Sequence, residues 1–142
     1  MGATGPSRGR RCILGCVALL GLSATFASAE PPAALMDVFR IAVEALAAQD
    51  LDRFMEQFDA KMPGYAELQQ SAGALLATDG VSSTIEPVTD EGNAERQQVQ
   101  VDWLLRTAQG QSRRQVIKCT LEKRGRSWKI VALEPVSFFK FD

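Results

Sequence analysis

The stretch Arg96-Gln-Gln-Val-Gln-Val-Asp-Trp-Leu-Leu-Arg-Thr107 alternates polar and apolar residues along its length. This period of two predicts a β-strand with one apolar face, made of Val99, Val101, Trp103 and Leu105. Two further strands are expected downstream, from Ser112 to Lys123 and from Ser127 to Val136, because a glycine-containing turn precedes each of them. The second half of the chain is therefore expected to be an antiparallel meander.

A weaker strand is expected before this stretch, from Val81 to Val88. Pro87 has no N–H to donate, so it should break the strand or confine it to an edge of the sheet. The residues from Asp90 to Asn93 have the composition of a turn.

Further upstream the apolar period is that of a helix. We expect a first helix through about Gln49, a second after the capping residue Asp50, and a third from Tyr65 to about Thr78. The apolar positions of these helices are Leu35, Val38, Phe39, Ala42, Val43, Leu46 and Ala47, then Leu51, Phe54, Met55 and Phe58, then Leu68, Ala72, Leu75 and Leu76. The expected fold class is α+β, with three N-terminal helices packed on one face of a curved, mainly antiparallel sheet of about four strands.

Turn lengths then predict the register of the sheet. A two-residue turn at Arg124-Gly125 would pair Cys119 with Ile130, and a three-residue loop from Gln109 to Gln111 would set Asp102 opposite Lys118. The face covered by helices would then hold Val99, Val101, Trp103, Ile117, Cys119, Leu121, Trp128, Ile130 and Ala132. The outer face would carry an apolar row of Leu104, Val116 and Leu133, with Val131 beside it.

The first thirty residues have the layout of a secretory signal peptide. Three arginines (Arg8, Arg10 and Arg11) precede an uncharged run from Cys12 to Phe26, and Ala27-Ser28-Ala29 is a small-residue cleavage site. We expect cleavage near Ala29, export to the periplasm or beyond the cell, and a mature chain, 30–142, that is one domain without a membrane span. The paired arginines leave the general secretory and twin-arginine routes both open.

Composition removes several classes of function. The chain has no histidine, which excludes the commonest general base and metal ligand, and the expected mature chain keeps only Cys119. We therefore expect no metal and no cofactor, and we interpret Cys119 as a buried apolar residue. The basic residues of the second half alternate with apolar ones in strands, so no nucleic-acid partner is expected.

Two segments carry a resemblance to a known family. The segment Ala47-Ala-Gln-Asp-Leu-Asp-Arg-Phe-Met-Glu-Gln-Phe58 and the segment Gly125-Arg-Ser-Trp-Lys-Ile-Val131 resemble the helix-turn-helix opening and the closing strand of the nuclear transport factor 2-like superfamily, the cystatin-like α+β cone. The chain is also similar to exported, uncharacterised bacterial members of that group, and the resemblance implies a cone-shaped fold rather than an activity.

The same superfamily includes enzymes resembling ketosteroid isomerase, and the resemblance lets their catalytic positions be compared. Ala42 stands where those enzymes carry a helix tyrosine, and the position of the catalytic carboxylate falls near Ala66. Neither side chain transfers protons. Tyr65 with Asp59, Glu67 or Asp79 could instead supply acid and base groups at the mouth of the cone.

These observations favour a non-catalytic binding domain, with two modes left open. One is a small apolar ligand held in the cone by Phe39, Phe54, Phe58, Tyr65, Trp103, Cys119, Leu121, Trp128 and Ile130. The other is a protein partner or a homodimer held by Leu104, Val116, Val131 and Leu133, together with the terminal Phe138, Phe139 and Phe141. The alternative is an isomerase- or dehydratase-like enzyme that uses loop carboxylates and Tyr65.

Overall fold

The computed structural model describes residues 32–77 and 80–141, which belong to the unit Pro31–Asp142. The predicted signal peptide lies outside the described residues. Three helices come first: α2 (Ala33–Ala47), α3 (Leu51–Met55) and α4 (Tyr65–Leu76). Four strands in the order β1-β2-β3-β4 follow and end in a short 3-10 helix: β1 (Val81–Gly92), β2 (Arg96–Thr107), β3 (Ser112–Arg124), β4 (Ser127–Glu134) and η4 (Val136–Phe139).

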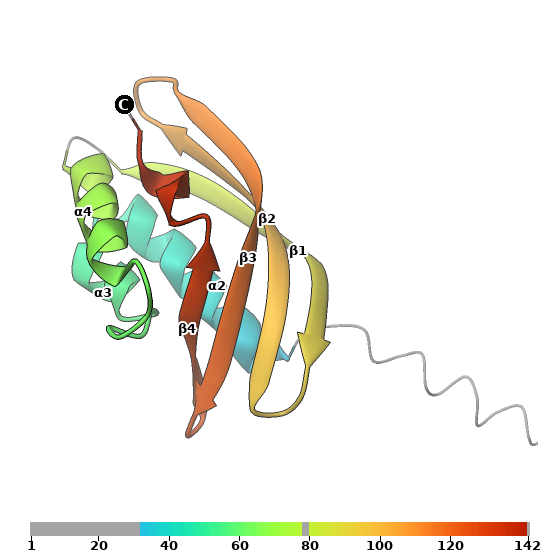
Figure 1. The fold of residues 1–142 in the computed structure, drawn as a ribbon. Coiled ribbons are helices and arrows are strands. Elements are labelled where there is room, and N and C mark those ends of the chain that lie inside the picture. The colour runs from blue at the N-terminus through green and yellow to red at the C-terminus, as the bar shows by residue number, and fades with distance from the viewer. Residues whose placement is uncertain (1–31, 78–79, 142) are drawn as a thin grey trace, which may run out of the picture. The chain divides into compact units, whose positions relative to one another are not determined.

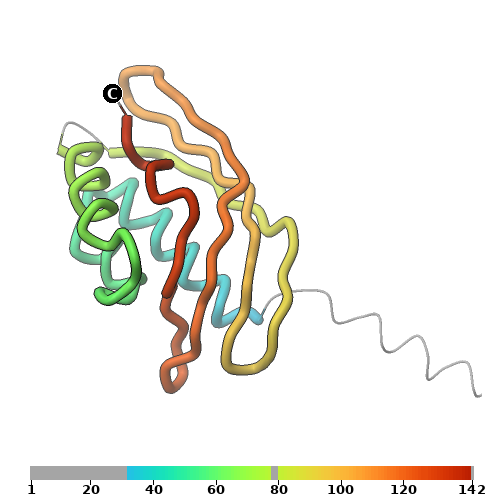
Figure 2. Tube along the Cα trace, in the orientation of Figure 1, coloured from blue at the N-terminus to red at the C-terminus, as the bar shows by residue number. Residues whose placement is uncertain are grey.

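All the strands are antiparallel, and the three helices lie on one side of the curved sheet (Figure 1). The predicted α+β architecture is confirmed. Figure 2 shows the C-terminal segment leaving β4 and turning back toward α4. We expected the last strand to continue to Val136, but β4 ends at Glu134, so the sequence did not predict this turn.

The helix boundaries follow local chemistry. Asp50 caps α3, as predicted, because its carboxylate accepts the backbone N–H of Arg53 at 3.1 Å. Gly64 precedes α4 with φ of +81°, and a Cβ at this position would lie 2.8 Å from Cγ2 of Val136. Glycine is therefore required here both by the backbone conformation and by the close approach of the C-terminal segment.

The first hairpin differs from the expectation. β1 is an edge strand with a register shift between Pro87 and Thr89, as Pro87 predicted, but it continues to Gly92. The predicted turn from Asp90 to Asn93 is wrong. The turn begins at Asn93, whose side-chain oxygen accepts the N–H groups of Glu95 at 2.8 Å and Arg96 at 3.0 Å.

Both predicted registers are wrong: by two residues between β2 and β3 and next to the β3–β4 turn, and by three beyond the bulge in β4, where Cys119 pairs with Leu133 rather than Ile130. Between β2 and β3 the last pair is Arg106 with Ser112, so the loop has five residues and Asp102 lies opposite Val116 rather than Lys118. Between β3 and β4 the two loop residues are Gly125 and Arg126, with φ of +68° at Gly125. A glycine at the first loop position is typical of a type II′ hairpin turn. A slip of two keeps each side chain on its face, so the predicted inner face survives in β2 and β3.

A bulge in β4 changes the faces of the last strand. Leu121 pairs with Ile130 but Thr120 pairs with Ala132, so Val131 is an extra residue. Leu133 consequently turns inward, where it is 2% exposed, and Ala132 does not join the covered face. The predicted outer position of Leu133 and the predicted inner position of Ala132 are both wrong.

Candidate functional site

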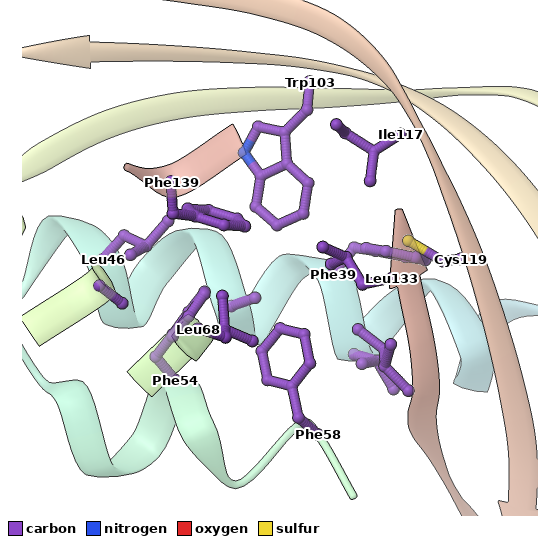
Figure 3. Close-up of a cluster of buried hydrophobic side chains, with 14 of the residues drawn as sticks. Phe39, Leu46, Phe54, Phe58, Leu68, Trp103, Ile117, Cys119, Leu133 and Phe139 are labelled. Atoms are coloured by element: carbon purple, nitrogen blue, oxygen red, sulfur yellow. The ribbon is translucent and has the colours of Figure 1, made fainter. Parts of the chain in front are cut away.

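The space between the helices and the inner face of the curved sheet, which we call the cone, contains eight of the nine predicted pocket residues. Each of the eight is at most 5% exposed; they are Phe39, Phe54, Phe58, Trp103, Cys119, Leu121, Trp128 and Ile130. Tyr65 is half-buried and packs against the edge of this cluster. Figure 3 shows the side chains of α2, the sheet and the C-terminal segment pointing toward one another in this layer.

Trp103 is surrounded by three aromatic rings. Its ring centroid lies 6.4 Å from that of Phe39, 6.0 Å from that of Phe138 and 5.2 Å from that of Phe139. Phe138 and Phe139 are 1% and 0% exposed. Phe138 and Phe139 therefore pack inside the cone, and the prediction that they contribute to a partner surface is wrong.

Arg113 links the C-terminal segment to the sheet by hydrogen bonds. Nη1 of Arg113 on β3 donates to the carbonyl oxygens of Ser137 at 3.2 Å, Phe138 at 3.0 Å and Lys140 at 2.8 Å. Its guanidinium carbon also lies 4.5 Å from the ring centroid of Phe141, within the range of a cation–π contact. Phe141, the third terminal phenylalanine, thus packs at the rim of the domain.

The interior has little capacity for acid–base chemistry. Among the described residues the buried groups are apolar except for Thr120, and burial raises the pKa of the Cys119 thiol to about 12. The thiol is therefore protonated at neutral pH, as expected for a buried apolar cysteine. Trp103 Nε1 is buried without a hydrogen-bond acceptor, and the ring of Phe139 stands edge-on to the indole.

The polar residues considered for an isomerase- or dehydratase-like enzyme lie outside this interior. Tyr65 and Asp59 line one surface pocket of about 410 Å³ together with Arg124 and Lys129. Asp59 accepts the backbone N–H of Lys61 at 2.8 Å and Nη2 of Arg124 at 2.7 Å, and these bonds lower the pKa of its carboxyl. Glu67 is exposed in the first turn of α4, and Asp79 lies outside the described residues.

Of the four predicted interface residues, Leu104 and Val116 are neighbours on the outer face of the sheet, and we call these two the outer-face patch; the predicted row is broken, because Val131 lies beside Thr120 and Leu121, further along β3. Val116 is 48% exposed, whereas Leu104 and Val131 are half-buried. Asp102 and Arg114 form a bidentate ion pair beside Leu104 and Val116, with Nη2 to Oδ2 at 2.7 Å and Nε to Oδ1 at 3.1 Å. Hydrogen bonding from Arg114 lowers the pKa of Asp102.

Within residues 32–77 and 80–141, no group of three or more Cys, Asp or Glu side chains is placed to hold a metal ion. In the same residues, no helix has both the length and the apolar character needed to cross a bilayer.

Comparison of the sequence with protein-family models and with curated proteins gave no match. Solved structures do match. A protein of unknown function with a cystatin-like fold from Nostoc punctiforme has a TM-score of 0.55 at 16% identity, over 69% of this chain and 84% of that chain. An NTF-2 like protein of unknown function from Shewanella oneidensis has a TM-score of 0.57 at 15% identity, over 69% and 92%.

A protein from Streptomyces avermitilis, provisionally assigned as a dehydratase of the NTF2-like family, has a TM-score of 0.53 at 14% identity, over 68% of this chain and 87% of that chain. Similarity at this level of identity concerns architecture, and activities differ widely within one fold. The order of helices and strands and these superpositions agree: the chain has the nuclear transport factor 2-like, cystatin-like fold.

Proposed function

We propose that this chain is a non-catalytic association domain that forms a homodimer through the outer-face patch of its sheet. The observation that carries the proposal is the filling of the cone by Trp103, Phe138 and Phe139. A ligand in the cone would have to displace rings that are already packed, at a cost of several kcal/mol. Binding is therefore assigned to the surface.

The chemistry of the outer face supports self-association. Val116 is one of two large apolar side chains that are exposed in the described part of the chain. Asp102 and Arg114 pair with each other next to it, so a second copy would meet both signs of charge there. A two-fold interface needs such self-complementarity.

The test is the molar mass in solution, measured by light scattering and by sedimentation. We expect a dimer at about 100 μM, and we expect Val116→Asp to weaken it at least about tenfold because a carboxylate would be desolvated at the centre of the patch. Val88→Asp is the matched control, because Val88 is 53% exposed but lies in β1 at the edge of the sheet. A monomeric parent chain, or equal dimerisation of Val116→Asp, would overturn the proposal.

One observation favours an acid–base enzyme as a second candidate, namely the shared pocket of Asp59 and Tyr65. Against it, Arg124 already holds the carboxylate of Asp59, and its lowered pKa makes it a weak base. If Asp59 were the base of an isomerase or dehydratase, Asp59→Asn would abolish turnover without loss of folding. A panel of cyclic ketones and hydroxy acids would detect such turnover.

We further propose that the protein acts after export, as the basic and apolar N-terminal segment favours. The expected mature chain begins at Glu30. Mass spectrometry of the protein recovered from the envelope and medium would show that N-terminus, and an intact Met1 in exported protein would contradict cleavage.

A further inference from the structure

The two edge strands of the sheet differ in whether the backbone along their outer side is paired. The outer edge of β4 is paired by the segment after α3: Asp59 N–H donates to Ile130 O at 2.8 Å, and Ile130 N–H donates to Gln57 O at 2.9 Å. Along the outer edge of β1, no strand or bridge pairs with the backbone within residues 32–77 and 80–141. β1 is thus the edge at which another strand can be added.

The free edge is usable over only part of its length. Pro87 has no N–H, and the register shift between Pro87 and Thr89 interrupts the ladder. The continuous segment runs from Val81 to Glu86, which is about 20 Å of extended backbone. Any added strand should therefore be short, of roughly six residues.

A groove lies beside this same segment. Its volume is about 530 Å³, and it is formed between α2 and β1 by Met36, Phe39, Val43 and Ile85, with Asp37, Arg40, Glu44 and Thr84 at the rim. Met36, Val43 and Ile85 are half-buried, so apolar surface remains open to a partner. Arg40 is held by Asp37 at 3.4 Å and by Glu44 at 2.9 Å, which leaves the rim without a free cation.

The charge of β1 indicates the chemistry of a partner. The strand contains three acids and no lysine or arginine: Glu86 ends the usable segment Val81–Glu86, and Asp90 and Glu91 follow beyond the register shift. None of the three forms an ion pair with another described residue of the chain. Opposite charges on neighbouring strands attract and like charges repel, so an added strand should be basic.

We propose that β1 accepts a short, extended, basic segment of a partner polypeptide as a fifth strand, with apolar side chains of that segment entering the groove between α2 and β1. Backbone hydrogen bonds along Val81–Glu86 supply affinity, and the groove selects the apolar side chains at alternate positions. This surface is separate from the outer-face patch, so it serves a different partner from the second copy proposed above.

The probe is the peptide acetyl-KVKIKVK-amide, in which apolar and basic residues alternate. Calorimetry with the chain should show saturable binding, at least about tenfold weaker when the lysines are replaced by glutamates. A version of the peptide with methylated backbone nitrogens should not bind, because it cannot form the ladder. Equal binding of the methylated or acidic peptides, or no binding of the basic one, would overturn the proposal.

Variants locate the site. Val43→Arg places a cation and a long side chain in the groove and should weaken peptide binding at least about tenfold, whereas Val88→Arg, beyond the register shift on β1, should change it less than about twofold. Hydrogen exchange supplies a readout on the unmodified chain. Amides of Ser82–Glu86 that do not donate to β2 should become protected when the peptide binds, and protection confined to β3 or β4 would refute the assignment.

Discussion

Phe139 stands edge-on to Trp103, with ring centroids 5.2 Å apart and ring planes at 85°. The two residues are separated in the sequence by β3 and β4, and their contact joins η4 to β2. Edge-to-face pairs of this kind stabilise a core beyond the area they bury. The C-terminal segment is therefore part of the core rather than a tail attached to it.

Phe139→Ala should lower the free energy of unfolding by about 3–5 kcal/mol, because it leaves a cavity beside Trp103 and Phe54. Urea denaturation followed by tryptophan fluorescence measures this loss. Val88→Ala is the control, and it should stay within about 0.5 kcal/mol of the parent chain because Val88 is exposed. A similar small loss for Phe139→Ala would contradict a core role.

Arg113→Lys should loosen the C-terminal segment selectively. A lysine ammonium cannot reproduce the guanidinium that contacts three carbonyl oxygens and the ring of Phe141, so we expect a loss of about 1–2 kcal/mol. The N–H groups of Phe138 and Lys140, which donate to Pro135 O and Ser137 O, should exchange faster. Exchange within β2 should not change, and uniform acceleration would indicate general destabilisation instead.

Acid should weaken the fold through Asp102. Because hydrogen bonding from Arg114 lowers the pKa of the folded carboxyl, the unfolded chain takes up a proton first as the pH falls. The stabilisation is present above about pH 4 and is lost below it, as the pH passes through the folded pKa. The melting temperature of Asp102→Asn should therefore fall less steeply with acid than that of the parent chain. Val88→Ala, which changes an exposed side chain and removes no ionisable group, should leave the slope unchanged.

Cys119 should be unreactive in the folded state. Its thiol is fully buried, and burial raises its pKa to about 12, so little thiolate is exposed to reagent. In the chain beginning at Glu30, a disulfide reagent such as DTNB should label this single thiol at least about a hundredfold more slowly than in guanidinium. Rapid labelling of the folded chain would show that the interior opens easily.

The periodicity of apolar residues was enough to predict the helices, the strands and the inner face of the sheet. Alternation in Arg96–Thr107 predicted β2 to the residue, and helical spacing predicted the buried positions Leu68, Ala72, Leu75 and Leu76 of α4. These predictions succeed because each helix or strand buries one face, so its apolar residues recur with the period of that element. For the candidate site, the same logic gathered eight of the nine predicted pocket residues in the interior.

The registers, the bulge and the contents of the cone depend on contacts between residues that are distant in sequence, so periodicity does not predict them. A slip of two residues keeps each side chain on its face, so burial cannot distinguish Asp102 opposite Lys118 from Asp102 opposite Val116; turn chemistry at Thr107–Gln111 and Gly125 does. Leu133 turns inward because one extra residue, Val131, is accommodated in β4. Phe138 and Phe139 fill the cone, and Arg113, distant in sequence, donates to the carbonyl oxygens of Ser137, Phe138 and Lys140; such long-range contacts leave no periodic signal in the sequence.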